Sequence, residues 1–304
     1  YHSNTYNQTF LGDLPEFTGY KQIYLQAGNV ENRGWEASLS YSDQFKFGLG
    51  ISSTLTFSRN INEIKEMVEN YHTDLMDEPI NIPEVLKDGG RVILKEGGTL
   101  GDLYSKADLV RNDKGYIEMD ANGALAKDAN VEPIKLGSVL PKANFAFSNE
   151  FTYKGVSAGF LLSCRLGGIV YSATQAALDQ YGVSEASAKA RDAGGVVING
   201  RTMINAQQWY ETIGSSSGLP QYYTYSATNI RLQEAHIGYT IPRRWLKNIC
   251  DINVSLVGRN LWMIYCKAPF DPESVATTSN YYQGIDYFMM PSTRNIGFNV
   301  KFNF

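Results

Sequence analysis

The side chains that most often carry out catalysis are few in this chain and lie far apart. His2, His72 and His236 have no metal-ligand spacing. The three cysteines are Cys164, Cys250 and Cys266. They form no C-x-x-C pair and are too few for a disulfide framework, so we expect inert packing. No nucleophile–base arrangement is visible. The sequence therefore predicts no catalytic residue, no metal site and no cofactor.

Two other ligand classes are also disfavoured. Segment 120–123 (Asp-Ala-Asn-Gly) resembles the beginning of a calcium-binding loop, but no glutamate stands at the twelfth position of that loop. A hairpin turn is the preferred interpretation. The chain has 27 basic and 31 acidic residues, a formal net charge of −4, whereas a nucleic-acid-binding face needs a strongly basic stripe. The sequence therefore predicts no nucleic-acid partner.

Aromatic side chains are the better candidates for binding. The 304 residues include 20 Tyr, 14 Phe and 4 Trp, and several of these cluster in segments expected to be long loops. Flat rings with hydroxyl tips suit sugar rings or peptide side chains. The same rings could instead pack the loops onto each other or form an aromatic belt, and both alternatives stay open. The candidate substrate-binding residues are Trp209, Tyr210, Tyr222, Tyr223, Tyr281 and Tyr282.

Strands must position these residues, because apolar and polar side chains alternate with a period of two through most of the chain. Many of the predicted strands have 11 to 15 residues, whereas strands of water-soluble proteins centre on about five or six. A strand that crosses a bilayer at a tilt needs about 9–11 residues. Seven such strands are predicted, at 35–42, 47–57, 144–153, 156–166, 226–241, 249–263 and 296–304.

The alternation predicts which face each strand residue occupies. An apolar set, expected to contact lipid, consists of Leu49, Leu55, Phe147, Phe160, Leu162, Val254 and Phe298. A polar set, expected to face the interior of a barrel, consists of Gly50, Thr54, Ser148, Ser163, Ser255 and Asn299. Three charged or titratable residues are predicted to line the same interior: Glu234, His236 and Arg165.

The connections between strands alternate strictly in length. Short connections are predicted at 43–44, 154–155 and 242–248, and long ones at 60–141, 172–225 and 264–291. This pattern is typical of an outer-membrane barrel, with tight turns at one rim and long extracellular loops at the other. No run approaches 18 consecutive apolar residues, which excludes a helical membrane span but does not exclude a transmembrane barrel.

Three short helices are predicted within the long loops. The spacing of apolar residues indicates an amphipathic helix over 61–68. Ser184 is a candidate N-cap for a helix that reaches Arg191, and Asn205 for one that ends near Gly214. We expect these helices to decorate a surface without forming a second core.

Eight short segments, in order, resemble SusC/RagA-type TonB-dependent outer-membrane transporters of the kind found in Bacteroidetes. They are residues 29–36, 136–141, 165–172, 190–195, 231–234, 258–262, 269–273 and 291–294. The resemblance covers 29–304 and implies the C-terminal part of a transporter barrel. Residues 1–28 are expected to be the end of a preceding strand or an extracellular loop. The family's plug domain and TonB-contacting segment are expected outside this chain.

The resemblance also implies a fold and a function. The fold would be all-β, the C-terminal strands of a large antiparallel transmembrane β-barrel of the 22-stranded, plugged type, with long extracellular loops. The function would be import of oligosaccharides (glycans) or peptides across the outer membrane of a Gram-negative bacterium. A SusD-like surface lipoprotein would cover the mouth, and the TonB complex would supply energy through the upstream part. Phe304 would be the C-terminal aromatic signal for barrel assembly.

Two alternatives belong to other classes. A soluble or surface β-domain that binds carbohydrate would also show alternation, but its strands are usually shorter. An outer-membrane enzyme would need a catalytic constellation in the loops or in the interior, and the sequence shows none. We therefore expect a transporter that is not an enzyme.

Overall fold

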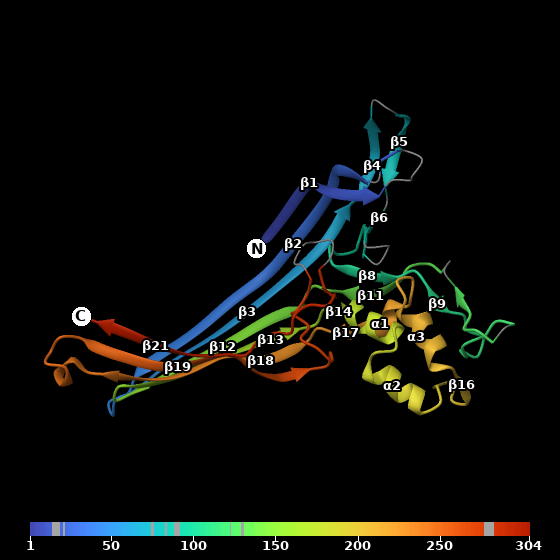
Figure 1. The fold of residues 1–304 in the computed structure, drawn as a ribbon. Helices are drawn as coiled ribbons and strands as arrows, with labels where there is room; N and C mark the ends of the chain where they lie inside the picture. Colours follow the sequence, from blue (N-terminus) through green and yellow to red (C-terminus); the bar gives the residue numbers. More distant parts are fainter. Residues whose placement is uncertain are drawn as a thin grey trace.

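The largest element of the structure is one long, eight-stranded antiparallel sheet (Figure 1). The computed structural model describes residues 1–13, 19–20, 22–73, 76–82, 84–87, 92–121, 123–128, 131–276 and 283–304. Each strand of the sheet pairs with the next sheet strand along the chain, as in a meander. The eight strands are β1 (His2–Asp13), β2 (Gln22–Gln44), β3 (Leu49–Glu66), β12 (Ala143–Tyr153), β13 (Val156–Leu166), β18 (Asn229–Ile241), β19 (Asp251–Cys266) and β21 (Asn295–Asn303). All seven predicted strands are present, and β1 precedes them.

The short connections lie at one end of the sheet. Lys154 (φ 48°) and Gly155 (φ 87°) form the two-residue turn between β12 and β13, with the positive φ values that suit a right-twisted hairpin. The short connection predicted at 43–44 is wrong, because these residues continue the β2–β3 ladder and pair with Ile51 and Gly50. The turn spans 45–48 instead.

The helix predicted over 61–68 is also wrong. β3 runs to Glu66 and stays paired with β2, so Glu63 lies directly opposite Glu31. The Lys65 ammonium bridges both carboxylates, at 3.0 Å from Glu31 and 2.8 Å from Glu63. The cross-strand ladder and this bridge override a local helical spacing.

The long connections carry smaller elements at the other end of the sheet. The first contains β4 (Val68–Thr73), β5 (Met76–Ile82), β6 (Glu84–Lys87), β7 (Val92–Lys95), β8 (Asp102–Ser105), β9 (Asp108–Leu109), β10 (Lys127–Asp128) and β11 (Ile134–Ser138). The second contains β14 (Ile169–Ser172), α1 (Ala173–Gln180), α2 (Glu185–Asp192), β15 (Val196–Ile198), β16 (Thr202–Ile204), α3 (Ala206–Gly214), the 3-10 turn η3 (Pro220–Tyr223) and β17 (Thr224–Ser226). The remaining elements are η4 (Arg243–Trp245) and β20 (Ile285–Asp286).

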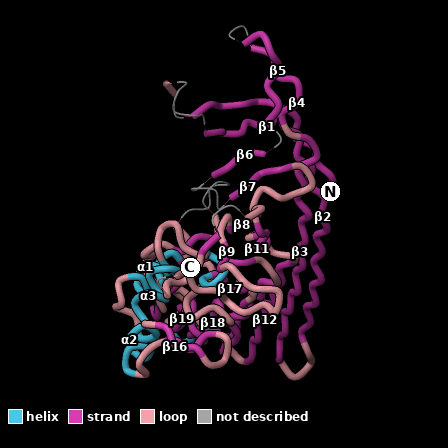
Figure 2. The backbone as a smooth tube through the Cα atoms, turned by 90° about the vertical axis from the view of Figure 1, so that its right-hand side faces the viewer, coloured by secondary structure: helices cyan, strands magenta, loops and turns pink. Residues whose placement is uncertain are grey.

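The three α-helices gather beside the sheet rather than within it (Figure 2). Ser184 caps α2 and Asn205 caps α3 through their side-chain oxygens, which confirms both predicted N-caps. Helix α1 escaped prediction, because its cap Ser172 is also the last residue of the apolar strand β14. Among the described residues, no helix is both long enough and apolar enough to cross a membrane.

The main hydrophobic core lies among the elements of the long connections (β4–β11, and β14–β17 with α1–α3), which we call the loop assembly. The expectation that the helices of these loops decorate a surface without forming a second core is therefore wrong. Leu94, Leu103, Tyr171, Ile213 and Leu219 are at most 5% exposed and belong to one buried cluster. They come from loop segments far apart in the sequence. The loops therefore fold on each other into a packed layer, a result of long-range contacts that local patterns do not show.

Candidate functional site

The strand register places the predicted apolar and polar sets on opposite faces of the sheet. Leu55, Phe147 and Leu162 lie directly opposite one another across β3, β12 and β13. Thr54 lies opposite Ser148 on the other face, and Ser255 lies opposite Asn299. Because facing residues of paired strands share one side of a sheet, this continuity across seven strands confirms the predicted alternation.

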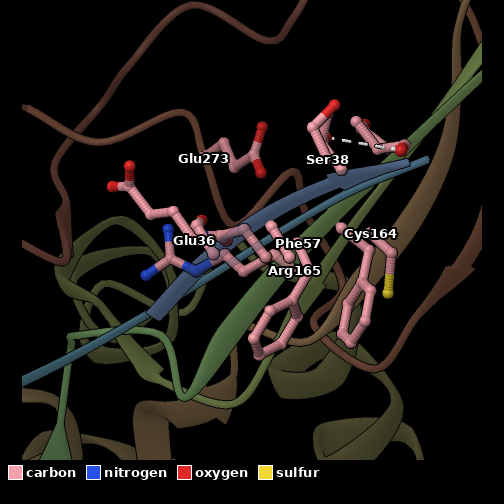
Figure 3. Close-up of a pocket in the computed structure, with 13 residues that line it drawn as sticks. Glu36, Ser38, Phe57, Cys164, Arg165 and Glu273 are labelled. Carbon is pink, nitrogen blue, oxygen red and sulfur yellow. Dashed lines mark hydrogen bonds between the residues drawn. The ribbon is translucent and has the colours of Figure 1, made fainter. Parts of the chain in front are cut away.

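Two rows of residues, polar except for one alanine, cross the polar face of the sheet side by side. The first row, in pairing order, is Glu36, Ser58, Asn144, Arg165 and Asn229. The second is Ser38, Thr56, Ala146, Ser163 and Arg231. Together with Glu273, which approaches from the loop after β19, most of these residues line a hollow of about 600 Å³. Figure 3 shows Glu36, Ser38 and Glu273 on one side of the strands and the Cys164 sulfur on the other.

Two arginines lie on the polar face: Arg165 lines the hollow together with Glu36 and Glu273, and Arg231 lies beside it. The Arg165 guanidinium donates from Nη2 to the Val139 carbonyl oxygen at 2.6 Å, and its Nε has no hydrogen-bond partner among the described residues. Arg231 is 5% exposed, and its Nη2 lies 2.7 Å from Asp271 Oδ1 and 3.2 Å from Glu273 Oε2. Within the part of the chain that the structure describes, the Nε of Arg231 likewise has no hydrogen-bond partner. The hollow therefore combines one guanidinium group and two carboxylates with serine and threonine hydroxyl groups, an arrangement that can bind polar oligomers.

A bulge explains why sequence reasoning missed Arg231. Strict alternation would put Arg231 and Glu234 on opposite faces, since they are three residues apart. The register shifts at Gln233, so Arg231 faces Ser163 and Glu234 faces Leu161 on the same side. Bulges commonly re-aim side chains in this way. Alternation in a single sequence carries no signal for this one.

Arg165, Glu234 and His236 all lie on the polar face, but they belong to separate contacts. His236 Nε2 lies 3.0 Å from a Glu150 carboxylate oxygen on the neighbouring part of the sheet. Glu234 accepts from Arg259 Nε at 2.9 Å. Their predicted role in lining an interior stays a prediction.

The aromatic candidates take part in the loop core. The rings of Trp209 and Tyr222 meet edge-on at 5.6 Å between centroids, and both pack against the buried cluster with Tyr210. Tyr223 is 2% exposed, and burial followed by the nearby Asp179 carboxylate raises its pKa. These contacts give the rings a packing role, while ligand contact stays a prediction. Tyr281 and Tyr282 lie outside the described residues.

The remaining chemistry-bearing groups are dispersed. Within the described ranges, no three His, Cys, Asp or Glu side chains are placed to hold a metal ion. The three cysteines are free. The Asp120 side chain accepts from the Ala124 N–H, which closes a turn at 120–124.

Three curated relatives from Formosa agariphila match the sequence of this chain. TonB-dependent receptor P3 is 22% identical over 99% of the chain, P26 is 24% identical over 95%, and P39 is 22% identical over 95%. The chain spans about a third of their length, from 31% to 32%. No family model matches.

Solved structures share the fold. The RagAB peptide importer in its "open-open" and "closed-closed" states and the RagAB peptide transporter each align over the whole chain with a TM-score of 0.70. Identity is 16–17%, and the alignment covers 32–33% of those chains. The predicted resemblance to SusC/RagA-type TonB-dependent transporters and the antiparallel all-β fold class are thereby confirmed. The names of these relatives denote receptors and importers, which fits a protein that is not an enzyme.

Proposed function

We propose that this chain forms part of the barrel wall of a TonB-dependent importer in the outer membrane of a Gram-negative bacterium. The observation that carries the proposal is the separation of apolar and polar residues onto two faces, in register across the sheet. A water-soluble sheet that is polar on one side would bury its apolar side against a second layer. Here the apolar side is open: Leu39 is 73% exposed and Phe298 is 81% exposed.

The height of the apolar face supports a membrane position. On β2 the outward residues between Arg33 and Asp43 are Trp35, Ala37, Leu39 and Tyr41. Ten residue steps at about 3.3 Å give roughly 33 Å along the strand. At the usual tilt of about 40° this corresponds to a band about 25 Å tall, the height of the apolar band of outer-membrane barrels. Charged residues bound the band at both ends.

The polar face would then line the interior through which cargo passes. Its serine and threonine hydroxyls donate and accept hydrogen bonds, and Arg165 adds an N–H group to which no described residue is bonded. Such a lining suits the hydroxyl groups of oligosaccharides and the amide groups of peptides. RagAB is a peptide importer. We extend to this chain the cargo classes of oligosaccharides and peptides.

The partners follow from the same proposal. A SusD-like surface lipoprotein would contact the long loops at the extracellular rim. TonB would act through residues that precede this chain in the full protein. Phe304, 86% exposed at the end of β21, would be read by the assembly machinery.

Uptake by the full-length transporter tests the function. Labelled oligosaccharides and labelled peptides are supplied to cells that carry the native protein, no protein, or one of two variants. Ser38→Trp and Ser163→Trp together would fill the hollow, because both positions lie in one row of the polar face. Leu39→Trp and Leu162→Trp introduce the same rings one residue away, on the apolar face.

We expect uptake of one cargo class to require the protein and TonB. Uptake should fall several-fold in the polar-face variant and stay near the native value in the apolar-face variant at equal surface abundance. Equal uptake with and without the protein for both cargo classes would contradict the proposal. A selective defect in the apolar-face variant would contradict the assignment of the two faces.

A further inference from the structure

A second cavity lies within the loop assembly, between the three helices and away from the polar rows of the sheet. It measures about 440 Å³, a size within the range of small-molecule pockets. Asp179 from α1, Arg191 from α2, and Tyr210 and Glu211 from α3 contribute to its lining. The side chains come from three helices, of which α3 packs against both α1 and α2.

Asp179 is the unusual member of this lining. Its side chain belongs to a residue that is 4% exposed; its Oδ1 accepts a hydrogen bond from Gln175 Nε2 at 2.9 Å, and the neutral Tyr223 hydroxyl group lies near the carboxylate. None of the described basic side chains forms an ion pair with it. A buried carboxylate without a counter-charge is costly unless a cation or several donors compensate it.

Arg191 does not supply that compensation. Its Nη1 donates to the Gly182 carbonyl oxygen at 2.7 Å and lies 3.4 Å from Ser187 Oγ, and the residue as a whole is exposed. The guanidinium is therefore held at the exposed part of the lining, whereas the Asp179 carboxylate is buried. A second carboxylate, that of Glu211, lines the same cavity.

We infer that this cavity binds a primary ammonium group, with the Asp179 carboxylate as its counter-charge and the Tyr210 ring beside it. Charge-assisted hydrogen bonds from an ammonium to a carboxylate are the strong ones in a partly desolvated site. A peptide N-terminus and an amino sugar both present this group. This inference adds a binding site to the proposed function. It depends on that function in one respect: the bound molecule is cargo only if the protein is an importer.

Binding to the purified full-length transporter tests the site without any transport step. The probes are glycylglycine against its N-acetylated form, and glucosamine against N-acetylglucosamine. Within each pair, acetylation converts the ammonium group into a neutral and larger amide, so the charge-removing variant below is needed to separate the effect of charge from that of size. We expect at least one free amine to bind more than tenfold more tightly than its acetylated partner, and the two pairs distinguish a peptide source from a sugar source.

Two variants then locate the binding. Asp179→Asn keeps the shape of the side chain and removes its charge, so the preference for the free amine should disappear. Glu185→Gln is the matched control, because Glu185 lies on α2 in an exposed pair with Lys189 and does not line the cavity. It should leave the preference unchanged. Equal binding of amine and acetylated probes by the native protein would overturn the inference, as would an unchanged preference in Asp179→Asn.

Failure of this site and failure of the proposed function are distinguishable. Uptake that depends on the polar face of the sheet, without amine preference in binding, would remove the ammonium site alone. Amine-specific binding without any uptake of labelled cargo would retain the site and remove the transport proposal.

Discussion

The sheet and the loop assembly differ in how far they bury their apolar side chains. In the sheet, long strands alternate two kinds of side chain, and the outward residues stay exposed; Phe298 and Leu39 are examples. In the loop assembly, short elements bury Leu94, Leu103 and Leu219 almost completely. The loops thus carry their own hydrophobic core. The sheet would owe its stability to backbone pairing and to a surrounding apolar medium.

Substitution of Arg231 should weaken the contact between the sheet and the loop after β19 more than any other change considered below. Arg231→Ala leaves Asp271 and the nearby Glu273 without their buried cation, a loss of about 3–5 kcal/mol for a buried pair. The effect should be local: faster hydrogen exchange and proteolysis over 267–276, with an intact β18–β19 ladder. Arg259→Ala is the control, since the pair of Arg259 with Glu234 is exposed. Equal exchange in the two variants would contradict this role.

A charge introduced on the outward, apolar face of the sheet should cause the next largest loss of stability. Phe298→Lys places a cation in the apolar band and should cost about 2–4 kcal/mol near its middle. Asn299→Lys, one residue away on the polar face, should have little effect, as the native Lys301 on that face suggests. Heat-induced unfolding of the full-length protein in membranes measures both. Similar losses would mean that the two faces do not differ in environment.

Deletion of Phe304 distinguishes a packing role of its ring from a role as a signal that the barrel-assembly machinery recognises. Burial of one rim aromatic contributes about 1.5–3 kcal/mol at most, too little to abolish a large barrel. If the residue is an assembly signal, the amount of full-length protein in the outer membrane should fall strongly while the remainder keeps normal heat resistance. Phe304→Trp should restore abundance. Normal abundance of the deletion would leave only packing.

A pH effect should also be confined to the loop that covers the hollow. Burial on its own raises the pKa of Asp271, but hydrogen bonds from Arg231, Ser292 and the Glu273 N–H outweigh it, so the pKa lies below its ordinary value of 3.8. A carboxyl group with a lowered folded-state pKa stabilises the fold above its unfolded pKa and loses that contribution as the pH falls through the folded value. Protease sensitivity of 267–276 should therefore rise only below about pH 3.8. Asp271→Asn should remove this rise; an unchanged acid profile would contradict the assignment.

The smallest expected effect lies in a turn. Gly155 has a φ of 87°, a backbone conformation that residues other than glycine rarely adopt. Gly155→Ala should therefore destabilise the β12–β13 hairpin by about 1 kcal/mol. Gly194, also at positive φ (83°) but in the loop assembly, provides a comparison. If only the sheet depends on backbone pairing, Gly155→Ala should loosen exchange across β12, and Gly194→Ala should not. Equal loosening of β12 would contradict the separation of the two regions.

The two regions also differ in what the sequence can predict. A residue's face in a strand follows from its neighbours two positions away, so the sequence correctly predicts the faces of the apolar set, the polar set and Arg165. The Gln233 bulge depends on pairing with β13 and β19, and the helix-like spacing at 61–68 is overridden by pairing with β2. The loop core joins residues such as Leu94 and Ile213, which are more than a hundred positions apart. Such contacts leave no local pattern.

Spin-label accessibility tests the two-faced wall most directly. Single labels at Leu55 and Thr54, adjacent on β3 and oppositely directed, are placed in the full-length transporter with its native cysteines replaced, in lipid bilayers. The label at 55 should collide readily with oxygen, which partitions into lipid, and poorly with a water-soluble nickel chelate. The label at 54 should show the reverse, and the pair at Phe298 and Asn299 should repeat the pattern. Equal accessibility to both reagents at 54 and 55, or the opposite preference, would contradict the account.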